Sequence, residues 1–365
     1  MILRPASDTA TPGRRRWSPD EVLPPGHLLR EELNARNISQ AELAMRTGLS
    51  PKHINQVIQG VVPLSAEVAL ILERVLGVQS HIWNGIEATF RDAQVRQAAH
   101  ERFHEFLGWA RKFPINELVK HHKLAPGDDG PTLVGKILAF FGVADPDAFG
   151  VLWNERSAAF RRTTQHPVDF YATATWLRLA ELAAAEITLE PFDSKAFASL
   201  LPQLRELTTQ PLSQALAELQ RRAATAGVAV VRIPEIPGTR TCGATRWINA
   251  AYPIVVLSGR YKAEDSVWFS FFHEAGHIIR HPKKMTYIRP DDGTGDGHEA
   301  EADQFAADTL IPPSMAPQLT GLRTTSQITA FAHQIGVDPG IVAGRLSNDK
   351  LLPWPQTRRL RKSFN

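Results

Sequence analysis

One apolar segment restricts the fold of the second half of the chain more than any other feature, because it places two histidines four residues apart. Residues 266–280 read SVWFSFFHEAGHIIR and contain no proline that would interrupt a helix. In an α-helix, side chains at positions i and i+4 lie on one face, so His273 and His277 can ligate the same metal ion. The segment is therefore predicted to be a buried helix that carries two metal ligands.

The residue that follows the first histidine supplies an acid–base group. Glu274 lies about 100° further round the helix, near enough to reach a water on the metal without ligating the metal itself. Gly276 costs about 1 kcal/mol inside a helix, so we expect a substrate or a neighbouring element to approach closely there. This pattern predicts metal-assisted hydrolysis with Glu274 as the general base.

A second predicted helix offers candidates for a third ligand. Residues 298–310 read HEAEADQFAADTL, with apolar side chains on one face and Glu299 and Asp303 on the other. A catalytic zinc takes three protein ligands, so one carboxylate is expected to ligate the metal and the other to accept a ring N–H of a ligating histidine. His298 and Glu301 compete for the third position, and Glu299 is preferred because Glu301 faces elsewhere.

The donor set also restricts the metal and the remaining chemistry. Two histidines and a carboxylate favour Zn²⁺, and Mn²⁺ stays open as an alternative. If the bond hydrolysed is a peptide bond, the site also needs a hydrogen-bond donor that stabilises the negative charge developing on the carbonyl oxygen of the substrate. The sequence offers four candidates for that role, namely His281, Tyr287, Arg289 and His298.

The first hundred residues show a different pattern, in which short helices are separated by capping residues. The predicted helices span residues 27–34, 40–47, 51–59 and 65–76. Ser39 is expected to cap the second helix in a capping box with Glu42, Gly48 supplies the turn, and Ser50-Pro51 begins the third helix. The predicted core consists of Leu43, Ala44, Leu49, Ile54, Val57 and Ile58. A helix, a glycine turn and a second helix predict a helix-turn-helix.

The third of these helices is the predicted recognition helix. Lys52, His53 and Gln56 are expected to point into the major groove of double-stranded DNA, while Gln40 and Asn55 hold phosphates. Charge adds little to this prediction, since residues 1–100 contain 11 Lys and Arg against 10 Asp and Glu and the whole chain carries only +3. The DNA-binding prediction therefore rests on the motif.

The metal-site pattern resembles that of the ImmA/IrrE metallopeptidases over residues 228–313. The resemblance is carried by a buried helix ending in His-Glu-x-Gly-His and by the following Glu-x-x-Ala-Asp-x-Phe-Ala helix. By position it implies that His273, His277 and Glu299 ligate zinc and that Glu274 is the base.

Two further positions bear on this resemblance. Asp303 stands where the family usually has Asn or Asp, which implies support of a ligand. Ala275 departs from the common Leu or Ile and leaves the chemistry intact. Known members act on repressor proteins, so the resemblance implies a repressor or an antitoxin as the protein substrate.

The N-terminal pattern is similar to the Cro/repressor-type (XRE) domains, and in particular to the HigA-like antitoxins. The similarity covers residues 25–86 and includes Leu76-Gly77-Val78 followed by Trp83. It implies a double-stranded DNA operator as a partner and connects the chain with toxin–antitoxin or stress-response regulation. Two-fold operators would fit a homodimer.

These patterns predict a mainly α fold with a small α+β catalytic domain, whose strands are expected at residues 228–233 and 252–257. No internal repeat is evident. The predicted parts are a flexible tail (1–24), a helix-turn-helix DNA-binding bundle (25–96), a helical middle region (97–226), a zincin-like metallopeptidase domain (227–320) and a C-terminal helical extension with a basic, solvated tail (321–365).

Composition and length exclude several other classes of protein. No apolar run approaches the roughly 18 residues that span a bilayer, so no membrane partner is expected. The first residues lack the apolar core of a secretory signal, and the lone Cys242 cannot form an internal disulfide. Both features predict a cytoplasmic protein.

The main hypothesis is a DNA-binding transcriptional regulator with zinc-dependent endopeptidase activity against a repressor or antitoxin. The alternative is a non-proteolytic transcription factor or HigA-like antitoxin in which the zinc fold is a sensor or scaffold. The first is favoured because a structural zinc site has no need of Glu274 and usually closes its fourth position with a protein ligand.

Overall fold

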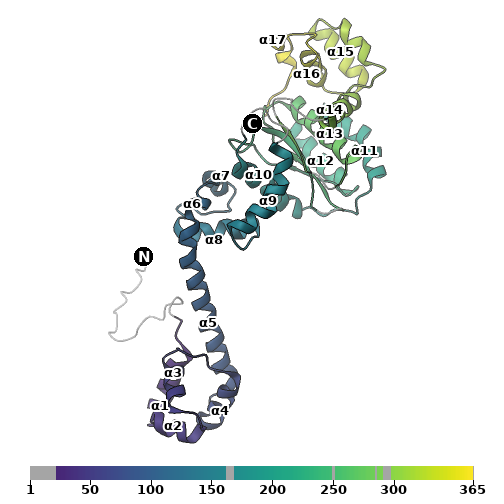
Figure 1. Ribbon diagram of the computed structural model, residues 1–365. Helices are drawn as coiled ribbons and strands as arrows, with labels where there is room; N and C mark the ends of the chain where they lie inside the picture. The colour runs from purple at the N-terminus through teal and green to yellow at the C-terminus, as the bar shows by residue number, and fades with distance from the viewer. Residues whose placement is uncertain (1–21, 162–167, 249–250, 284–285, 291–296, 365) are drawn as a thin grey trace, which may run out of the picture. The chain divides into compact units, whose positions relative to one another are not determined.

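The computed structural model describes residues 22–161, 168–248, 251–283, 286–290 and 297–364, with side chains except at 154–161 and 288–290 (Figure 1). Contacts within the chain divide it into two units, one ending at His104 and the other beginning at Glu105. The predicted flexible tail falls, for residues 1–21, outside the described residues.

The first unit is a bundle of helices around one small core. Its helices are α1 (Pro25–Ala35), α2 (Gln40–Thr47), α3 (Pro51–Ile58), α4 (Ala66–Leu76) and α5 (Ser80–Arg102). All the predicted core residues are buried except Leu49, which is partly buried at its edge. The indole of Trp83 on α5 is fully buried in the same core, and it donates to the carbonyl of Val78 at 3.1 Å.

Caps at the helix ends create the turn between α2 and α3. Gly48 ends α2 in the left-handed conformation, with φ of 71°, and the side chain of Ser50 accepts the backbone N–H of His53 at the start of α3. Ser39 likewise caps α2 by accepting the N–H of Glu42. The predicted capping box is wrong in its second half, because the Glu42 carboxylate pairs with Arg46 one turn later, where it gains a charged partner.

The second unit begins with a series of helices. They are α6 (Leu107–Ala110), α7 (Ile115–Lys120), α8 (Gly130–Phe141), α9 (Pro146–Arg161), α10 (Phe170–Ala185), α11 (Ser194–Glu206) and α12 (Leu212–Ala224). The later ones do not form a separate linker, since α11 and α12 contribute buried leucines to the same core as the sheet that follows.

A four-stranded sheet lies at the centre of this unit. Its strands are β1 (Ala229–Arg232), β2 (Thr241–Trp247), β3 (Pro253–Leu257) and β4 (Tyr287–Pro290), in the order β1-β3-β2-β4. β1 and β3 are parallel, whereas β2 is antiparallel to both β3 and β4. β1 and β3 lie where the sequence predicts strands, whereas β2 and β4 were not predicted.

Helices cover both faces of this sheet. On β2, Thr245 faces α13 (Glu264–Arg280), where its hydroxyl meets Glu274. The next residue, Arg246, faces the opposite side and pairs with Glu181 of α10. α14 (Gly297–Leu310) then packs along α13, and the two helices lie side by side in Figure 1.

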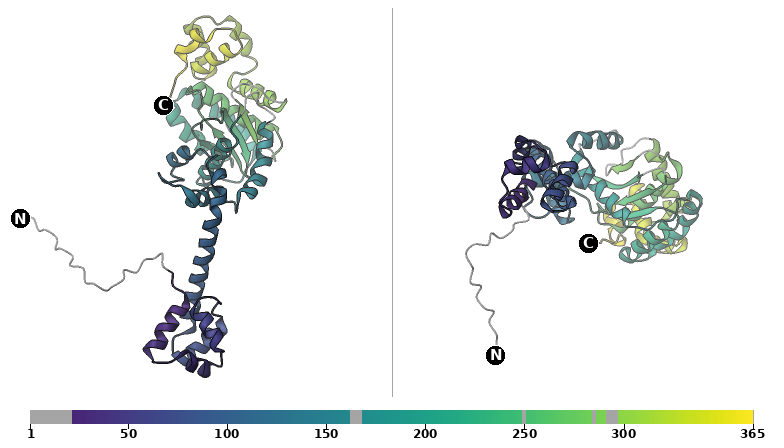
Figure 2. Two further views of the ribbon diagram at one scale, coloured as in Figure 1. Left: turned by 60° about the vertical axis from the view of Figure 1, so that its left-hand side comes forward. Right: turned by 90° about the horizontal axis from the view of Figure 1, so that it is seen from below.

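The last three α-helices of the described chain, coloured yellow-green to yellow in Figure 2, are α15 (Thr325–Ile335), α16 (Pro339–Asn348) and α17 (Trp354–Thr357). α15 and α17 pack around α16, which in turn contacts α13. In the predicted basic, solvated tail, Arg358, Arg359 and Lys362 are exposed. The tail is also anchored, because Arg361 donates to the buried Asp265 at 2.8 Å and Lys362 pairs with Asp338. Among the described residues, no helix combines the length and the apolar character needed to cross a bilayer.

Candidate metal centre and recognition helix

The helix that carries the metal motif is buried along nearly its whole length. α13 crosses one face of the sheet, and apolar residues such as Phe271 and Phe272 fill the core on either side of it. His273, Glu274 and His277 each have an exposed fraction of 0%. Three polar side chains placed at this depth require polar partners or a bound ion.

The ring nitrogens of the two histidines converge with a carboxylate from α14. His273 Nε2 lies 3.0 Å from His277 Nε2, while Glu299 lies 3.1 Å from the first and 3.4 Å from the second. Ligand atoms about 2.0–2.1 Å from a tetrahedral zinc lie about 3.3 Å from one another. The three side chains therefore have the spacing of a three-ligand zinc site.

The hydrogen bonds on the far side of each ring support the same conclusion. His273 Nδ1 lies 2.8 Å from Asp303 Oδ1, and His277 Nδ1 lies 2.8 Å from His281 Nδ1. If both Nδ1 atoms donate, both Nε2 atoms present lone pairs to each other and to Glu299. Such electron-rich atoms repel one another unless a cation lies between them, so the residues present fit a metal ion.

Burial and pairing keep two of these groups in the forms that bind a metal. Burial lowers the pKa of His277 to about 4, so its imidazole is neutral at neutral pH. Burial alone would raise the pKa of Glu299, but the two neighbouring histidines, His273 and His277, together outweigh burial and lower the pKa to about 2. A neutral imidazole and an ionised carboxylate are the ligating species.

Glu274 is held by the strand that sequence analysis missed. The hydroxyl of Thr245 lies 2.7 Å from Glu274 Oε2 and 2.9 Å from the carbonyl oxygen of Glu274. On the same strand, a Cβ built on Gly243 would lie 2.8 Å from Glu274 Oε1. β2 therefore supplies both a donor for this carboxylate and the space that it occupies.

Gly276 lets α14 approach the metal helix. A Cβ at this position would lie 3.0 Å from the ring of Phe305 and 3.3 Å from the Cα of Ala302. The close approach that the sequence predicted at Gly276 is therefore made by α14, which is also the helix that carries Glu299 and Asp303.

The remaining candidates near the motif take different positions. His281 contacts His277, and Glu301 contacts His281 at 3.2 Å, so Glu301 lies one residue further out than the converging ligands. Tyr287 stacks on the His277 ring with centroids 4.2 Å apart, and His298 packs against His281. The side chain of Arg289 lies outside the described part.

The predicted DNA contacts all lie on the surface of the first unit. Lys52 and Asn55 on α3 are exposed, and His53 and Gln56 on the same helix are half-buried. Gln40 is exposed at the first position of α2. The side chains of α3 that face inward are Ile54, Val57 and Ile58, which fix the helix in the core and leave its polar side outward.

Comparison with known proteins matches both parts of the chain. Residues 29–83 match the family model of a helix-turn-helix, and residues 225–347 match the peptidase family model described as the IrrE N-terminal-like domain. No curated protein matches the chain. The chain joins a helix-turn-helix of the XRE type to an IrrE N-terminal-like domain, as the sequence motifs predicted.

Proposed function

We propose that this chain, with a DNA-binding helix-turn-helix and an IrrE N-terminal-like domain, is a transcriptional regulator that is also a zinc-dependent endopeptidase. The observation that carries the proposal is the convergence of His273, His277 and Glu299 beside the buried carboxylate of Glu274. The resemblance to the ImmA/IrrE family suggests a repressor or an antitoxin as the substrate.

The chain's own residues would divide the work of peptide hydrolysis. His273, His277 and Glu299 would hold zinc, which when bound acts as a Lewis acid that makes water acidic enough to lose a proton near neutral pH. Glu274 would accept that proton and later deliver it to the amine that leaves. The hydroxyl of Thr245 would hold Glu274 in position during both transfers.

The competing function is a regulator whose zinc fold is only a scaffold or sensor. The helix-turn-helix match supports DNA binding in either case. A purely structural zinc site would have no use for a buried carboxylate next to its ligands. A substitution of Glu274 therefore distinguishes a peptidase from a scaffold or sensor.

Metal content and one matched substitution test the proposal. The purified wild-type protein is expected to hold about one zinc per chain, and His273→Ala and Glu299→Ala are expected to lose it. Glu274→Gln should keep the zinc and lose cleavage, and it can then trap the substrate protein from a lysate of the source cells. A Glu274→Gln protein that cleaves the trapped protein as fast as the wild type would refute the peptidase proposal.

A further inference from the structure

The two histidines of the metal centre are supported by different groups. A histidine that ligates through Nε2 must donate its Nδ1–H to an acceptor, which fixes the tautomer and the direction of the ring. His273 has a carboxylate acceptor, Asp303 Oδ1 at 2.8 Å. His277 has a second imidazole instead, His281 Nδ1 at 2.8 Å. The sequence motif gave no acceptor for His277.

The position of each proton follows from this contact. If His277 donates from Nδ1, then Nδ1 of His281 must be the unprotonated nitrogen that accepts. The proton of His281 is then on Nε2, which lies 3.2 Å from Glu301 Oε2. With the protons so placed, the three side chains would form a chain of two hydrogen bonds that point outward, from the metal side to a carboxylate.

The fold restricts His281 to this orientation. His281 caps the end of α13, one turn after His277, and its side chain is only 2% exposed. Its ring packs against His298 at 4.5 Å and against Tyr287 at 5.3 Å. Rotation of the imidazole would therefore disturb neighbours on both α14 and β4.

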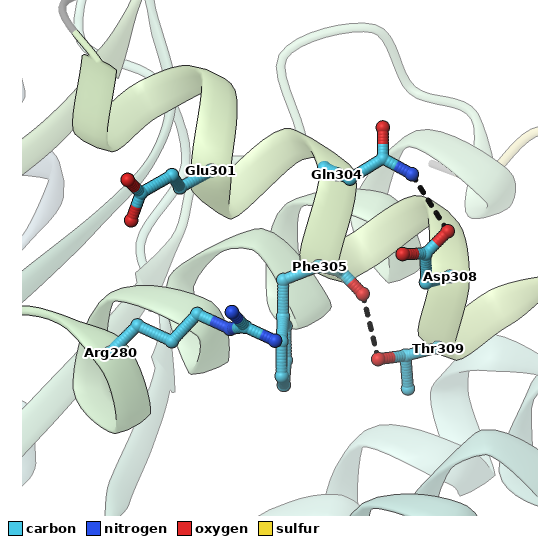
Figure 3. A pocket seen from close by; sticks show the side chains of 6 residues that line it. All are labelled: Arg280, Glu301, Gln304, Phe305, Asp308 and Thr309. Carbon is cyan, nitrogen blue, oxygen red and sulfur yellow. Dashed lines mark hydrogen bonds between the residues drawn. The ribbon is translucent and has the colours of Figure 1, made fainter.

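Glu301 lies at the outer end of the chain, on a surface pocket of about 330 Å³ (Figure 3). Arg280 lines the same pocket, but its guanidinium lies over the ring of Phe305 at 5.2 Å. Figure 3 shows this guanidinium turned to Phe305, away from the carboxylate of Glu301. Glu301 is thus placed to accept from His281.

We propose that His281 is a positioning residue of the metal centre. It holds His277 in the tautomer and orientation that direct Nε2 at the metal, and Glu301 fixes the tautomer of His281. This inference rests on the proposed zinc site, and it adds to it a supporting residue on α13 itself. His281 is not assigned as a ligand, because both of its ring nitrogens are engaged by His277 and Glu301.

Two substitutions separate the acceptor from the bulk of the ring. His281→Asn keeps an acceptor near the position of Nδ1, whereas His281→Phe keeps a ring and removes the acceptor. The zinc dissociation constant is measured by competition with a chromophoric chelator, and the absorption spectrum of the Co²⁺-loaded protein reports ligand geometry. We expect His281→Phe to weaken zinc binding about 10–100-fold and His281→Asn to stay within about threefold of the wild type.

Glu301→Ala provides an independent test of the same hydrogen-bonded chain. It should weaken zinc binding in the wild-type protein to a smaller extent, because its side chain is 62% exposed, and should have no further effect in His281→Phe. Circular dichroism of the metal-free proteins checks that each variant is folded.

The outcomes distinguish this inference from the function on which it rests. A wild-type protein that binds zinc, together with a folded His281→Phe of equal affinity, overturns the positioning role and leaves the proposed function intact. Equal losses in His281→Asn and His281→Phe also overturn it, since the acceptor that His281→Asn retains would then make no difference to zinc binding. A wild-type protein that binds no zinc overturns both.

Discussion

At the scale of residues, the sequence predicted those site residues whose positions follow from the spacing of side chains along a helix. His273 and His277 lie on one face because they are four residues apart, and Glu299 and Asp303 share a face for the same reason. The structure brings these four side chains together, and their roles as ligands and as support stay predictions. The contact of Thr245 with Glu274 could not be predicted, because the two residues are 29 positions apart in sequence and only the packing of α13 on the sheet brings them together.

The contact between Thr245 and Glu274 gives a prediction at this scale. Thr245→Val keeps the volume of the side chain and removes the only donor that it offers to a fully buried carboxylate. Loss of a hydrogen bond to a buried charged group should lower the free energy of unfolding by about 1–3 kcal/mol, with zinc retained. Denaturant unfolding measures the loss.

A double-mutant cycle supplies the control for Thr245→Val. In the Glu274→Gln background the charge is gone, so the same substitution should cost at least about 1 kcal/mol less. Costs that agree in the two backgrounds within about 0.5 kcal/mol would show that the hydroxyl does not act on the carboxylate.

At the scale of elements, the local signals for helices were strong and those for two strands were weak. β1 and β3 are runs of β-branched residues, which favour strands. β2 reads TCGATRW and is buried on both faces, so it shows no alternation of polar and apolar residues. Its Gly243 reads as a break in sequence, yet glycine is needed there because Glu274 fills the space beside it.

Within the described residues, the local geometry between α2 and α3, a left-handed glycine followed two residues later by a helix cap, is found again between α15 and α16. α15 ends at Gly336, which is in the left-handed conformation. Asp338 then caps α16 by accepting the backbone N–H of Gly340, and a proline follows the cap as the first residue of the helix. Gly48 and Ser50 do the same between α2 and α3. The two turns share backbone conformation and capping ability more than residue identity.

The second helices of the two pairs, α3 and α16, differ in how far their side chains are buried. The positions of α16 that match Lys52 and Asn55 are Gly340 and Ala343, and both are buried. α16 packs on the metal helix, so its outward positions are not available to a DNA groove. Of the two helices, only α3 presents polar side chains in the manner of a recognition helix.

A substitution on α3 tests that assignment. Gln56→Ala removes a side chain predicted to read a base edge, and should weaken operator binding by about 1–3 kcal/mol while binding to unrelated DNA changes little. A gel shift at fixed salt concentration measures both affinities. Gln97→Ala, an exposed position late in α5, is the matched control. Equal operator affinity for Gln56→Ala and Gln97→Ala would remove Gln56 from the interface.

At the scale of the whole molecule, the extent of the second unit was the hardest feature to predict. The catalytic domain was expected at residues 227–320, and its boundaries were set by where strand and metal motifs begin and end. The observed core also draws on leucines of α11 and α12 and on Phe331, Val342 and Leu346 of the C-terminal helices. Sequence patterns show that such helices are amphipathic, but they do not show which surface covers the apolar face.

Because the two units have separate cores, metal removal should destabilise only one of them. Zinc that binds the folded form alone adds about 2.7 kcal/mol at 100 times its dissociation constant. Chelation should therefore speed the exchange of the most protected amides in α13 and α14 about 100-fold and leave those of α1 to α4 unchanged.

Hydrogen exchange followed by mass spectrometry resolves these segments in the intact chain. In His273→Ala, which lacks a ligand, addition or removal of zinc should change exchange in neither unit. If α1 to α4 lost protection by the same factor as α13, the two cores would unfold as one cooperative block, and the metal could then influence DNA binding directly. Unchanged exchange in α1 to α4 would mean that the metal centre does not alter the stability of the helix-turn-helix unit.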